Sequence, residues 1–194
     1  VPEIPITSIT NGVHPRSWCA QNITELYDRY FGPRFYDEPT NFNVWNRMDR
    51  ISNQELWRAH ERNKERLVAF TRDRLKIQLI SRGASSSQLS VADEVLSPYA
   101  LTFSFARRFA TYKRANLLFR DPQRLIRLLT DNDHPIQFIF SGKAHPHDSE
   151  GKELIREIIH LCMSEEFYGK VIFLEDYSMD MARHLVGGVD VWLN

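Results

Sequence analysis

The stretch Leu101-Thr102-Phe103-Ser104-Phe105-Ala106 decides the fold of this 194-residue chain, because it is the first of several short apolar segments that alternate with helical patterns. Further strand-like segments follow at Ile136–Phe140, Val171–Leu174 and Val189–Leu193. Strands that alternate with helices form a parallel sheet with right-handed crossovers. These segments are apolar on both faces, as strands in a sheet covered on both sides are. The C-terminal half is therefore expected to have an α/β fold built on a parallel sheet.

Helical patterns connect these strands. The first begins near Tyr112 and restarts at Asp121-Pro122, where aspartate can cap a helix and proline suits its first turn. The second runs from Lys152 to about Met163, and the third from Met179 to Val186. Cys162 lies on the apolar side of the second helix, which predicts a small core residue.

The region before Leu96 lacks this alternation and is expected to be mostly helical or irregular. It opens with the turn-rich segment Ser8–Pro15, and an aromatic stretch from Tyr27 to Trp45 follows. A capping-box pattern at Ser52 and Glu55 then starts a long helix, supported by apolar residues at near-helical spacing, namely Leu56, Leu67, Phe70 and Ile77. The stretch 83–87, Gly-Ala-Ser-Ser-Ser, is expected to end this helix as a mobile loop or linker.

Composition excludes several classes of protein. The chain is 42% hydrophobic and 26% charged, and its 25 Lys and Arg balance its 25 Asp and Glu. A strongly basic nucleic-acid binder is therefore not expected, and neither is a polybasic membrane anchor. No apolar run approaches the about 20 residues of a membrane-spanning helix. The distant cysteines Cys19 and Cys162 form no disulfide framework, which fits a reducing compartment such as the cytoplasm.

The two ends of the chain suggest a piece of a longer protein. The first residue is Val1 rather than methionine, and the last segment reads as a strand with no turn or helix after it. We therefore expect a site completed by later sequence to be missing from this chain.

Three loops follow the predicted strands, and the carboxyl ends of parallel strands are where α/β sheets bind ligands. They are the stretches 107–114, 142–148 and 175–178. The first contains Arg107, Arg108, Lys113 and Arg114 and leads into an expected helix N-terminus, which favours an anion. Arginine offers a planar fork to phosphate oxygens, and lysine adds a point charge. The pattern predicts a site for phosphate or a phosphorylated ligand, although a solvated charged surface is the usual meaning of a basic run.

Other candidate sites are weaker. His145, His147 and Asp148 have no strong metal-ligand spacing, so a polar loop is favoured and no metal is expected. Glu175 and Asp176 are neighbours at a strand end and would point in opposite directions, which argues against a glycosidase pair. The aromatic residues from Tyr27 to Trp45 could stack on sugars, but packing within the domain is favoured.

Four segments resemble successive motifs of the glycogen/α-glucan phosphorylase family, most closely the shorter bacterial and archaeal type. They are the stretches 10–14, 106–114, 141–146 and 173–177. The resemblance implies the GT-B architecture, in which two Rossmann-like domains face a cleft and the C-terminal one holds pyridoxal 5'-phosphate. Residues 1–96 would be the end of the N-terminal domain plus connecting helices, and residues 97–194 the start of the C-terminal domain. Ala110-Thr111 replaces the His-Glu pair of the larger members, and Ser178 stands where they often have arginine.

The resemblance implies phosphorolysis of an α-1,4-glucan. Inorganic phosphate would take the terminal glucosyl unit and give glucose 1-phosphate with retention. Two residues carry over as catalytic contacts to the substrate phosphate, namely Arg108 and Lys113. Two carry over as cofactor contacts, Arg107 and Tyr177. Four carry over as substrate-binding residues, Asn11, Gly12, Gly142 and Lys143. The Schiff-base lysine would lie beyond Asn194, so the isolated chain is expected to hold no covalent cofactor and to show no turnover.

Two alternatives stay open at this point. A nucleotide-sugar-dependent glycan synthase of the same architecture would lack the Gly-rich, lysine-containing segment expected after Asn194. A non-catalytic module that binds phosphate or glucan would need no cofactor at all. A homo-oligomer of the full-length protein is also left open, whereas nucleic acid and membranes are not expected as partners.

Overall fold

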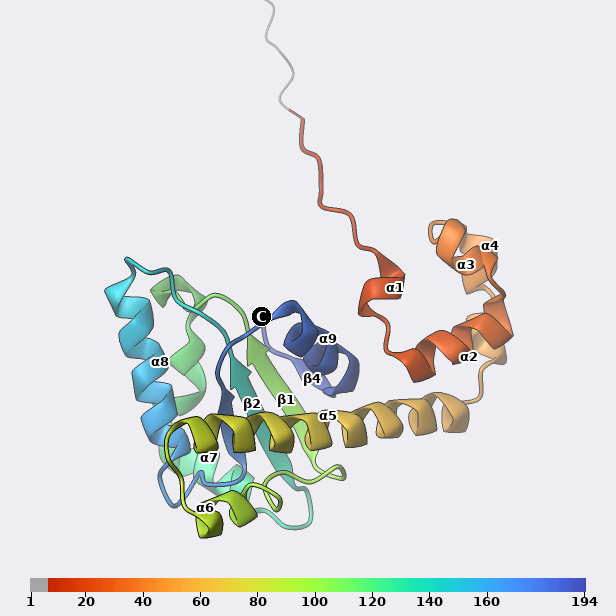
Figure 1. The fold of residues 1–194 in the computed structure, drawn as a ribbon. Helices are drawn as coiled ribbons and strands as arrows, with labels where there is room; N and C mark the ends of the chain where they lie inside the picture. The colour runs from red at the N-terminus through yellow and green to blue at the C-terminus, as the bar shows by residue number, and fades with distance from the viewer. Residues whose placement is uncertain (1–6) are drawn as a thin grey trace, which may run out of the picture.

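The computed structural model describes residues 7–194, and its C-terminal half is built on four parallel strands (Figure 1). They are β1 (Leu101–Ala106), β2 (Ile136–Ser141), β3 (Val171–Leu174) and β4 (Val191–Trp192), in the order β3-β2-β1-β4. Every pair of neighbours is parallel. This is the order in which the first four strands of a doubly wound sheet lie. The predicted α/β class and parallel sheet are confirmed, and β4 is shorter than the segment 189–193 predicted for it.

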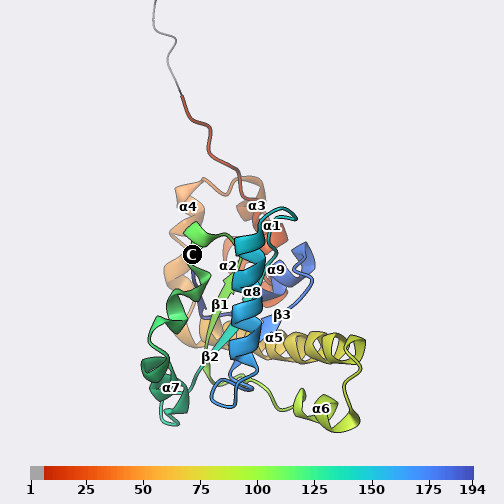
Figure 2. The same ribbon diagram turned by 90° about the vertical axis from the view of Figure 1, so that its left-hand side faces the viewer.

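Helices cover both sides of the sheet (Figure 2). On the α7/α8 side lie α7 (Pro122–Thr130) and α8 (Ser149–Cys162), and on the α5/α9 side lie α5 (Asn53–Ser81) and α9 (Met179–Gly188). The side chains of one strand alternate between the two sides: Phe138 and Phe140 pack against α7 and α8, whereas Ile139 packs toward α5 and α9. Burial on both sides explains why these strands are almost wholly apolar.

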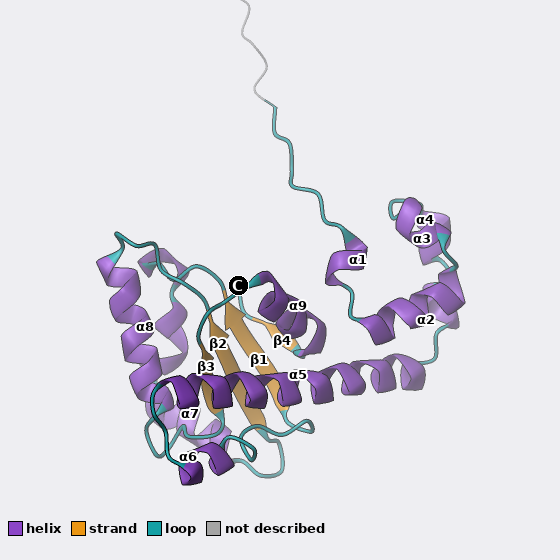
Figure 3. Ribbon diagram, viewed as in Figure 1, coloured by secondary structure: helices purple, strands orange, loops and turns teal. Residues whose placement is uncertain are grey.

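Helix α5 begins where the capping box predicts. The Ser52 hydroxyl accepts a hydrogen bond from the Glu55 N–H at 3.2 Å. Leu67 is 1% exposed where α5 packs on the sheet, whereas Leu56 is 39% exposed and Ile77 is 56% exposed. The 29-residue helix is longer than the sheet it covers, so only its middle part is buried there (Figure 3).

The predictions for two of the segments that connect helices and strands are wrong. The expected linker at 83–87 contains the start of α6 (Ser86–Val91), capped by Ser85, whose N–H donates to Gln88 Oε1 at 2.9 Å. The expected helix from Tyr112 is instead two 3-10 helices, η2 (Thr111–Lys113) and η3 (Ala115–Arg120). Arg114 between them has a φ of 54°, and this left-handed residue interrupts the helical backbone. No α-helix N-terminus therefore follows the first loop directly, and α7 starts at Pro122, after the cap that Asp121 provides.

Short helices form the N-terminal part of the described chain. They are α1 (Pro15–Trp18), α2 (Gln21–Phe31), α3 (Arg34–Asp37), α4 (Phe42–Trp45) and η1 (Met48–Arg50). Phe31, Phe35 and Trp45 pack ring against ring with centroids 4.9–6.0 Å apart, which confirms the packing role predicted for the aromatic stretch. The turns predicted for the segment Ser8–Pro15 are not found over residues 8–14, which form no turn and are exposed.

Helix α5 joins the two halves of the chain by polar contacts as well as apolar ones. The Asp190 carboxylate, just before β4, accepts hydrogen bonds from His60 Nε2 at 2.6 Å, Lys64 Nζ at 2.8 Å and the Thr102 N–H at 2.7 Å. The division into residues 1–96 and 97–194 stays a prediction. Among the helices of residues 7–194, none combines the length and apolar character needed to cross a lipid bilayer.

Candidate active site

The loops after β1 and β2 are joined at the carboxyl edge of the sheet. The Phe109 N–H donates to the Lys143 carbonyl at 2.9 Å, and Phe109 forms an isolated parallel bridge with Ala144. The end of β2 is tied to the end of β3, since the Ser141 hydroxyl donates to the Leu174 carbonyl at 2.8 Å. The sheet topology thus brings the three predicted loops to one rim.

Gly142 lets the first two loops approach each other. A Cβ at this position would lie 2.0 Å from the Arg107 carbonyl oxygen and 2.6 Å from the Phe109 ring, and the backbone φ is 153°. Only glycine tolerates both the contact and the conformation. Gly142 is itself buried, so it shapes the rim by close backbone packing.

A cavity of about 700 Å³ opens at the ends of β1 and β4. The strand order reverses between these two strands, and a doubly wound sheet binds its ligands at such a switch point. We call it the switch-point cavity. Its cationic lining is Arg107, Lys113 and Arg114, and its apolar wall includes Phe105, Phe140 and Leu193.

The cations of the switch-point cavity are unneutralised. Arg107 Nη1 donates to the Asn194 side-chain oxygen at 2.5 Å, and Lys113 Nζ lies 4.8 Å from the centre of the Tyr112 ring. Within residues 7–194, neither they nor Arg114 forms an ion pair, and no Asp or Glu side chain lines the cavity. In a chain with no net charge, this is a local concentration of positive charge beside an apolar wall. The arrangement can bind an oxyanion.

The structure brings only some of the predicted site residues together. Arg107 and Lys113 line one cavity, whereas Arg108 and Lys143 are exposed and lie outside its lining. Tyr177 is half-buried and packs against the core on the α5/α9 side, where burial raises the pKa of its phenol. The contacts to substrate or cofactor predicted for all of these residues stay predictions.

Asn11 and Gly12 lie in the extended segment that leaves the body of the molecule before α1 (Figure 1). Both residues are exposed, and no atom lies within 4 Å of a Cβ placed on Gly12. This chain does not bring them to the rim, so their role near the glucosyl unit also stays a prediction.

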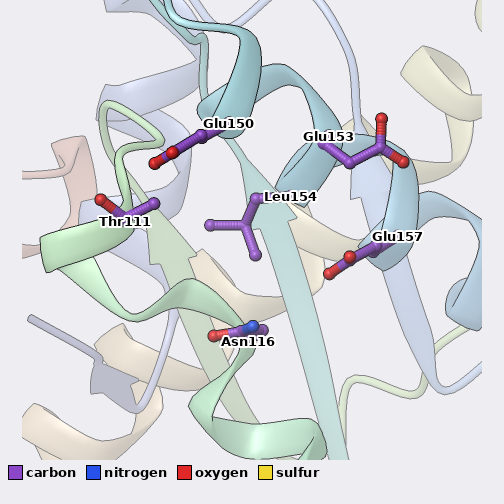
Figure 4. A pocket seen from close by; sticks show the side chains of 6 residues that line it. All are labelled: Thr111, Asn116, Glu150, Glu153, Leu154 and Glu157. Carbon is purple, nitrogen blue, oxygen red and sulfur yellow. The ribbon is translucent and has the colours of Figure 1, made fainter.

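A second hollow, of about 320 Å³, lies beside η2 and η3 and is acidic (Figure 4). Glu150, Glu153 and Glu157 of α8 line it with Thr111 and Asn116, and Leu154 points into its middle. Glutamates would repel a phosphate. The anion is therefore expected in the switch-point cavity.

The other acidic and histidine residues of the rim have local roles. Glu175 is ion-paired with Arg82, and Asp176 is exposed with a φ of 56°. His145 Nδ1 accepts a hydrogen bond from the His147 N–H at 3.2 Å. In the part of the chain that the structure describes, no group of three or more His, Cys, Asp or Glu residues is arranged to hold a metal ion.

Sequence reasoning missed Asn194 as a member of the site. Its position directly after β4 was the available signal, because β4 lies next to β1 and places Asn194 beside Arg107. The apolar wall from η3, with Leu117 and Leu118, was hidden by the expectation of an α-helix there.

A doubly wound α/β sheet with a cationic cavity at its switch point is the arrangement of an α/β domain that can bind an oxyanion. The profile of the carbohydrate phosphorylase family matches residues 3–192, and the chain belongs to this family. It is 41% identical over 192 residues to the glycogen phosphorylase of Aquifex aeolicus, covering 99% of this chain and 28% of that protein. It is 40% identical over 192 residues to the maltodextrin phosphorylase of Thermococcus litoralis, covering 99% of this chain and 22% of that protein.

The predicted family resemblance is confirmed. The chain spans about a quarter of the length of these curated relatives, namely 28% and 22%. Its parallel sheet and helical N-terminal half are consistent with a fragment of a GT-B phosphorylase.

Proposed function

We propose that this chain is part of an α-glucan phosphorylase, which transfers the terminal α-1,4-glucosyl unit of a glucan to inorganic phosphate and releases glucose 1-phosphate. The names of the relatives, glycogen and maltodextrin phosphorylases, support this substrate class. The observation that carries the proposal is the switch-point cavity, whose three cations face no carboxylate among the described residues.

The chain's own contribution to the reaction would be to bind and orient phosphate. A phosphate dianion taken out of water needs compensating positive charge, and the apolar wall of Phe105, Phe140 and Leu193 strengthens each electrostatic contact. Arg107 supplies a planar fork, and Lys113 from the same loop supplies a compact charge. Held between them, the phosphate would be oriented for attack on the glucosyl carbon.

Arg108 is assigned to a different phosphate contact from Arg107. It is exposed beside the cavity, whereas its neighbour Arg107 lines it. We assign Arg107 and Lys113 to the oxyanion held within this chain. Arg108 is assigned to a phosphate contact completed by the rest of the protein.

The donor set fits the phosphate group of pyridoxal 5'-phosphate, because unpaired guanidinium and ammonium groups are what such a group requires. Arg107 and Lys113 would then be shared between that group and the substrate phosphate, and Tyr177 would support the rim next to it. When bound, the cofactor supplies a phosphate group that can hold a proton next to the substrate phosphate. Two phosphates close together repel each other, which accounts for several cations in one cavity.

The cysteines support a proposal for the cellular setting. Cys19 and Cys162 are both free thiols, which suits a reducing compartment, so we place the protein in the cytoplasm.

The test uses both this chain and the full-length protein. Titration of the chain with inorganic phosphate at constant ionic strength should shift the amide resonances of Lys113 and Asn194. Arg107→Gln should weaken that binding at least tenfold, and Arg108→Gln should leave it within twofold. Equal effects of the two substitutions would overturn the assignment of Arg107.

The full-length protein should release glucose 1-phosphate from a glucan and phosphate. Transfer of a glucosyl unit from a nucleotide sugar to a glucan, with release of the nucleoside diphosphate, would instead support the glycan synthase. Phosphate binding without either activity would support a non-catalytic module.

A further inference from the structure

A second polar pocket, of about 240 Å³, lies where the start of α2, the middle of α5 and helix α9 meet. Figure 1 shows α1 and the start of α2 close to α9, above α5. This α2/α5/α9 pocket is on the α5/α9 side of the sheet, away from the helices that flank the switch-point cavity. Its polar lining consists of Gln21, Asn63, Arg66, Asp180, Arg183 and His184.

Small residues and one stacked ring build the walls. A Cβ on Gly187 would lie 3.0 Å from the Cβ of Ala20, so this pair sets the close approach of α9 to the start of α2. The His184 ring stacks on Phe70 with centroids 3.9 Å apart, and its Nδ1 lies 2.9 Å from the Asp180 carbonyl oxygen. The ring is therefore fixed, and Nε2 is its free nitrogen among the described contacts.

The start of α2 lies at the pocket, because Ala20 and Gln21 line it. Ala20 is the N-cap of this 11-residue helix, and within the described structure it provides no side-chain cap and the first turn holds no acidic residue. The first N–H groups of a helix have no partner inside the helix and carry the positive end of its dipole. Such a helix end favours an anion.

Asn63 gives an independent indication of a ligand. This residue is 5% exposed, and its Oδ1 accepts a hydrogen bond from Asn22 Nδ2 at 2.8 Å. Its own Nδ2 is buried and has no partner in the part of the chain that the structure describes. Buried donors of this kind are nearly always satisfied in proteins, so an acceptor is expected there.

The charges of the pocket agree with an anionic ligand. Arg66 and Arg183, one from each of two helices, form no ion pair within residues 7–194. Asp180 is the one carboxylate among the lining residues listed above, and its side chain is 70% exposed to water, which screens its repulsion. Arg66 and Arg183 are exposed as well, so water screens all three charges, and two guanidinium groups stand against one carboxylate.

We propose that the α2/α5/α9 pocket is a second oxyanion site, which takes a phosphate group held by Arg66, Arg183, the start of α2 and the Asn63 amide. The inference does not depend on the proposed function, because it rests on residues on the other side of the sheet. The same chemistry suits free phosphate and the phosphate of a sugar phosphate, and the test separates the two.

The test follows amide resonances of the 194-residue chain during titration with inorganic phosphate, at an ionic strength held constant with chloride. Gln21 and Asn22 should shift saturably, with an affinity independent of that reported by Lys113. The double variant Arg66→Gln/Arg183→Gln should weaken this binding at least tenfold. The matched control Arg127→Gln, an exposed arginine on α7, should leave it within twofold.

A second variant keeps the test decisive if the double variant fails to fold. Ala20→Asp places a carboxylate at the N-cap of α2, which should compete with the anion and abolish binding while both arginines remain. Titration with glucose 1-phosphate then separates the sources. Binding at least tenfold tighter than that of inorganic phosphate marks a sugar-phosphate site, and similar affinities mark a free-phosphate site.

Three results would overturn the proposal. The first is the absence of a saturable shift at Gln21 and Asn22 with either ligand. The second is the same shift with chloride alone. The third is unchanged phosphate affinity in both the double variant and Ala20→Asp. Failure of Lys113 to respond would count only against the switch-point cavity.

Discussion

The buried cations on the α5/α9 side of the sheet and the cations at the rim of the switch-point cavity are held in different ways. On the α5/α9 side, Lys64 is buried with its side chain 5% exposed and bonded to Asp190, and Arg72 donates to the carbonyls of Val95 and Leu96 at 2.9 Å. On the α7/α8 side, the core is mainly aromatic and aliphatic, and Arg107 and Lys113 at its rim have no carboxylate partner among the described residues. Cations that support the fold are satisfied by the protein, whereas cations left unpaired in a cavity are available to a ligand.

The largest loss of stability is expected from removing one of the buried, hydrogen-bonded cations. Lys64→Ala removes a buried ammonium that donates to Asp190 and to the Ala100 carbonyl, and it leaves the Asp190 carboxylate short of a partner. Breaking a buried pair in this way destabilises a protein by about 4 kcal/mol. Urea denaturation should show this loss in the free energy of unfolding. A change below about 1 kcal/mol would mean that Asp190 is solvated well enough without Lys64.

The next largest loss of stability is expected from a substitution at the rim. Gly142→Ala places a Cβ 2.0 Å from the Arg107 carbonyl oxygen, and the loops must separate to make room. Overpacking and an unfavourable φ together should reduce the free energy of unfolding by about 3 kcal/mol. The matched control is Gly12→Ala, where no atom lies within 4 Å of the added Cβ, and its effect should be below about 0.5 kcal/mol. Similar stabilities of the two variants would contradict the close loop packing.

The pH dependence of stability should come from the α5/α9 side. Burial alone would raise the pKa of Asp190, but hydrogen bonds from Lys64, His60 and the Thr102 N–H outweigh it, so the pKa lies below its usual value. The unfolded state then binds a proton more readily than the folded state does. The stabilising contribution of Asp190 is complete above the ordinary aspartate pKa of about 3.9 and is lost as the pH falls through the lowered folded value.

Unfolding in urea at several pH values measures this contribution. Wild type should exceed Asp190→Asn in stability at pH 7, and the difference should shrink as the pH falls below about 4. A difference that is constant with pH would show that the charge of Asp190 makes no contribution.

The sequence predicts the sheet well because its signals are local. Each of β1, β2 and β3 is a short apolar run with turn residues at its ends, and the structure reproduces these runs within one residue. The failures also have local causes. Arg114 adopts a left-handed φ that a helical pattern does not reveal, and Gln88, three residues after Ser85, carries the capping signal in a serine run that reads as a linker.

The candidate site is predictable only in part. Topology alone places the basic loop at the switch-point rim. Which of Arg107 and Arg108 enters the cavity depends on the path of the loop around Gly142, and neighbouring arginines carry no sequence signal for it. The contact of Lys64 with Asp190 joins residues 126 positions apart, and only the finished packing of α5 on the sheet creates it.

The smallest effect on stability, and the sharpest contrast with Lys64, is expected at Lys113. Its ammonium contacts the Tyr112 ring at 4.8 Å and no carboxylate of the described chain. Lys113→Met keeps the length of the side chain and should change the free energy of unfolding by less than about 0.5 kcal/mol. Phosphate binding at the switch-point cavity should nevertheless weaken at least tenfold, as isothermal titration calorimetry can measure in low-salt buffer. A Lys113→Met protein that unfolds easily but binds phosphate normally would reverse the assignment, because it would make this lysine a structural cation like Lys64.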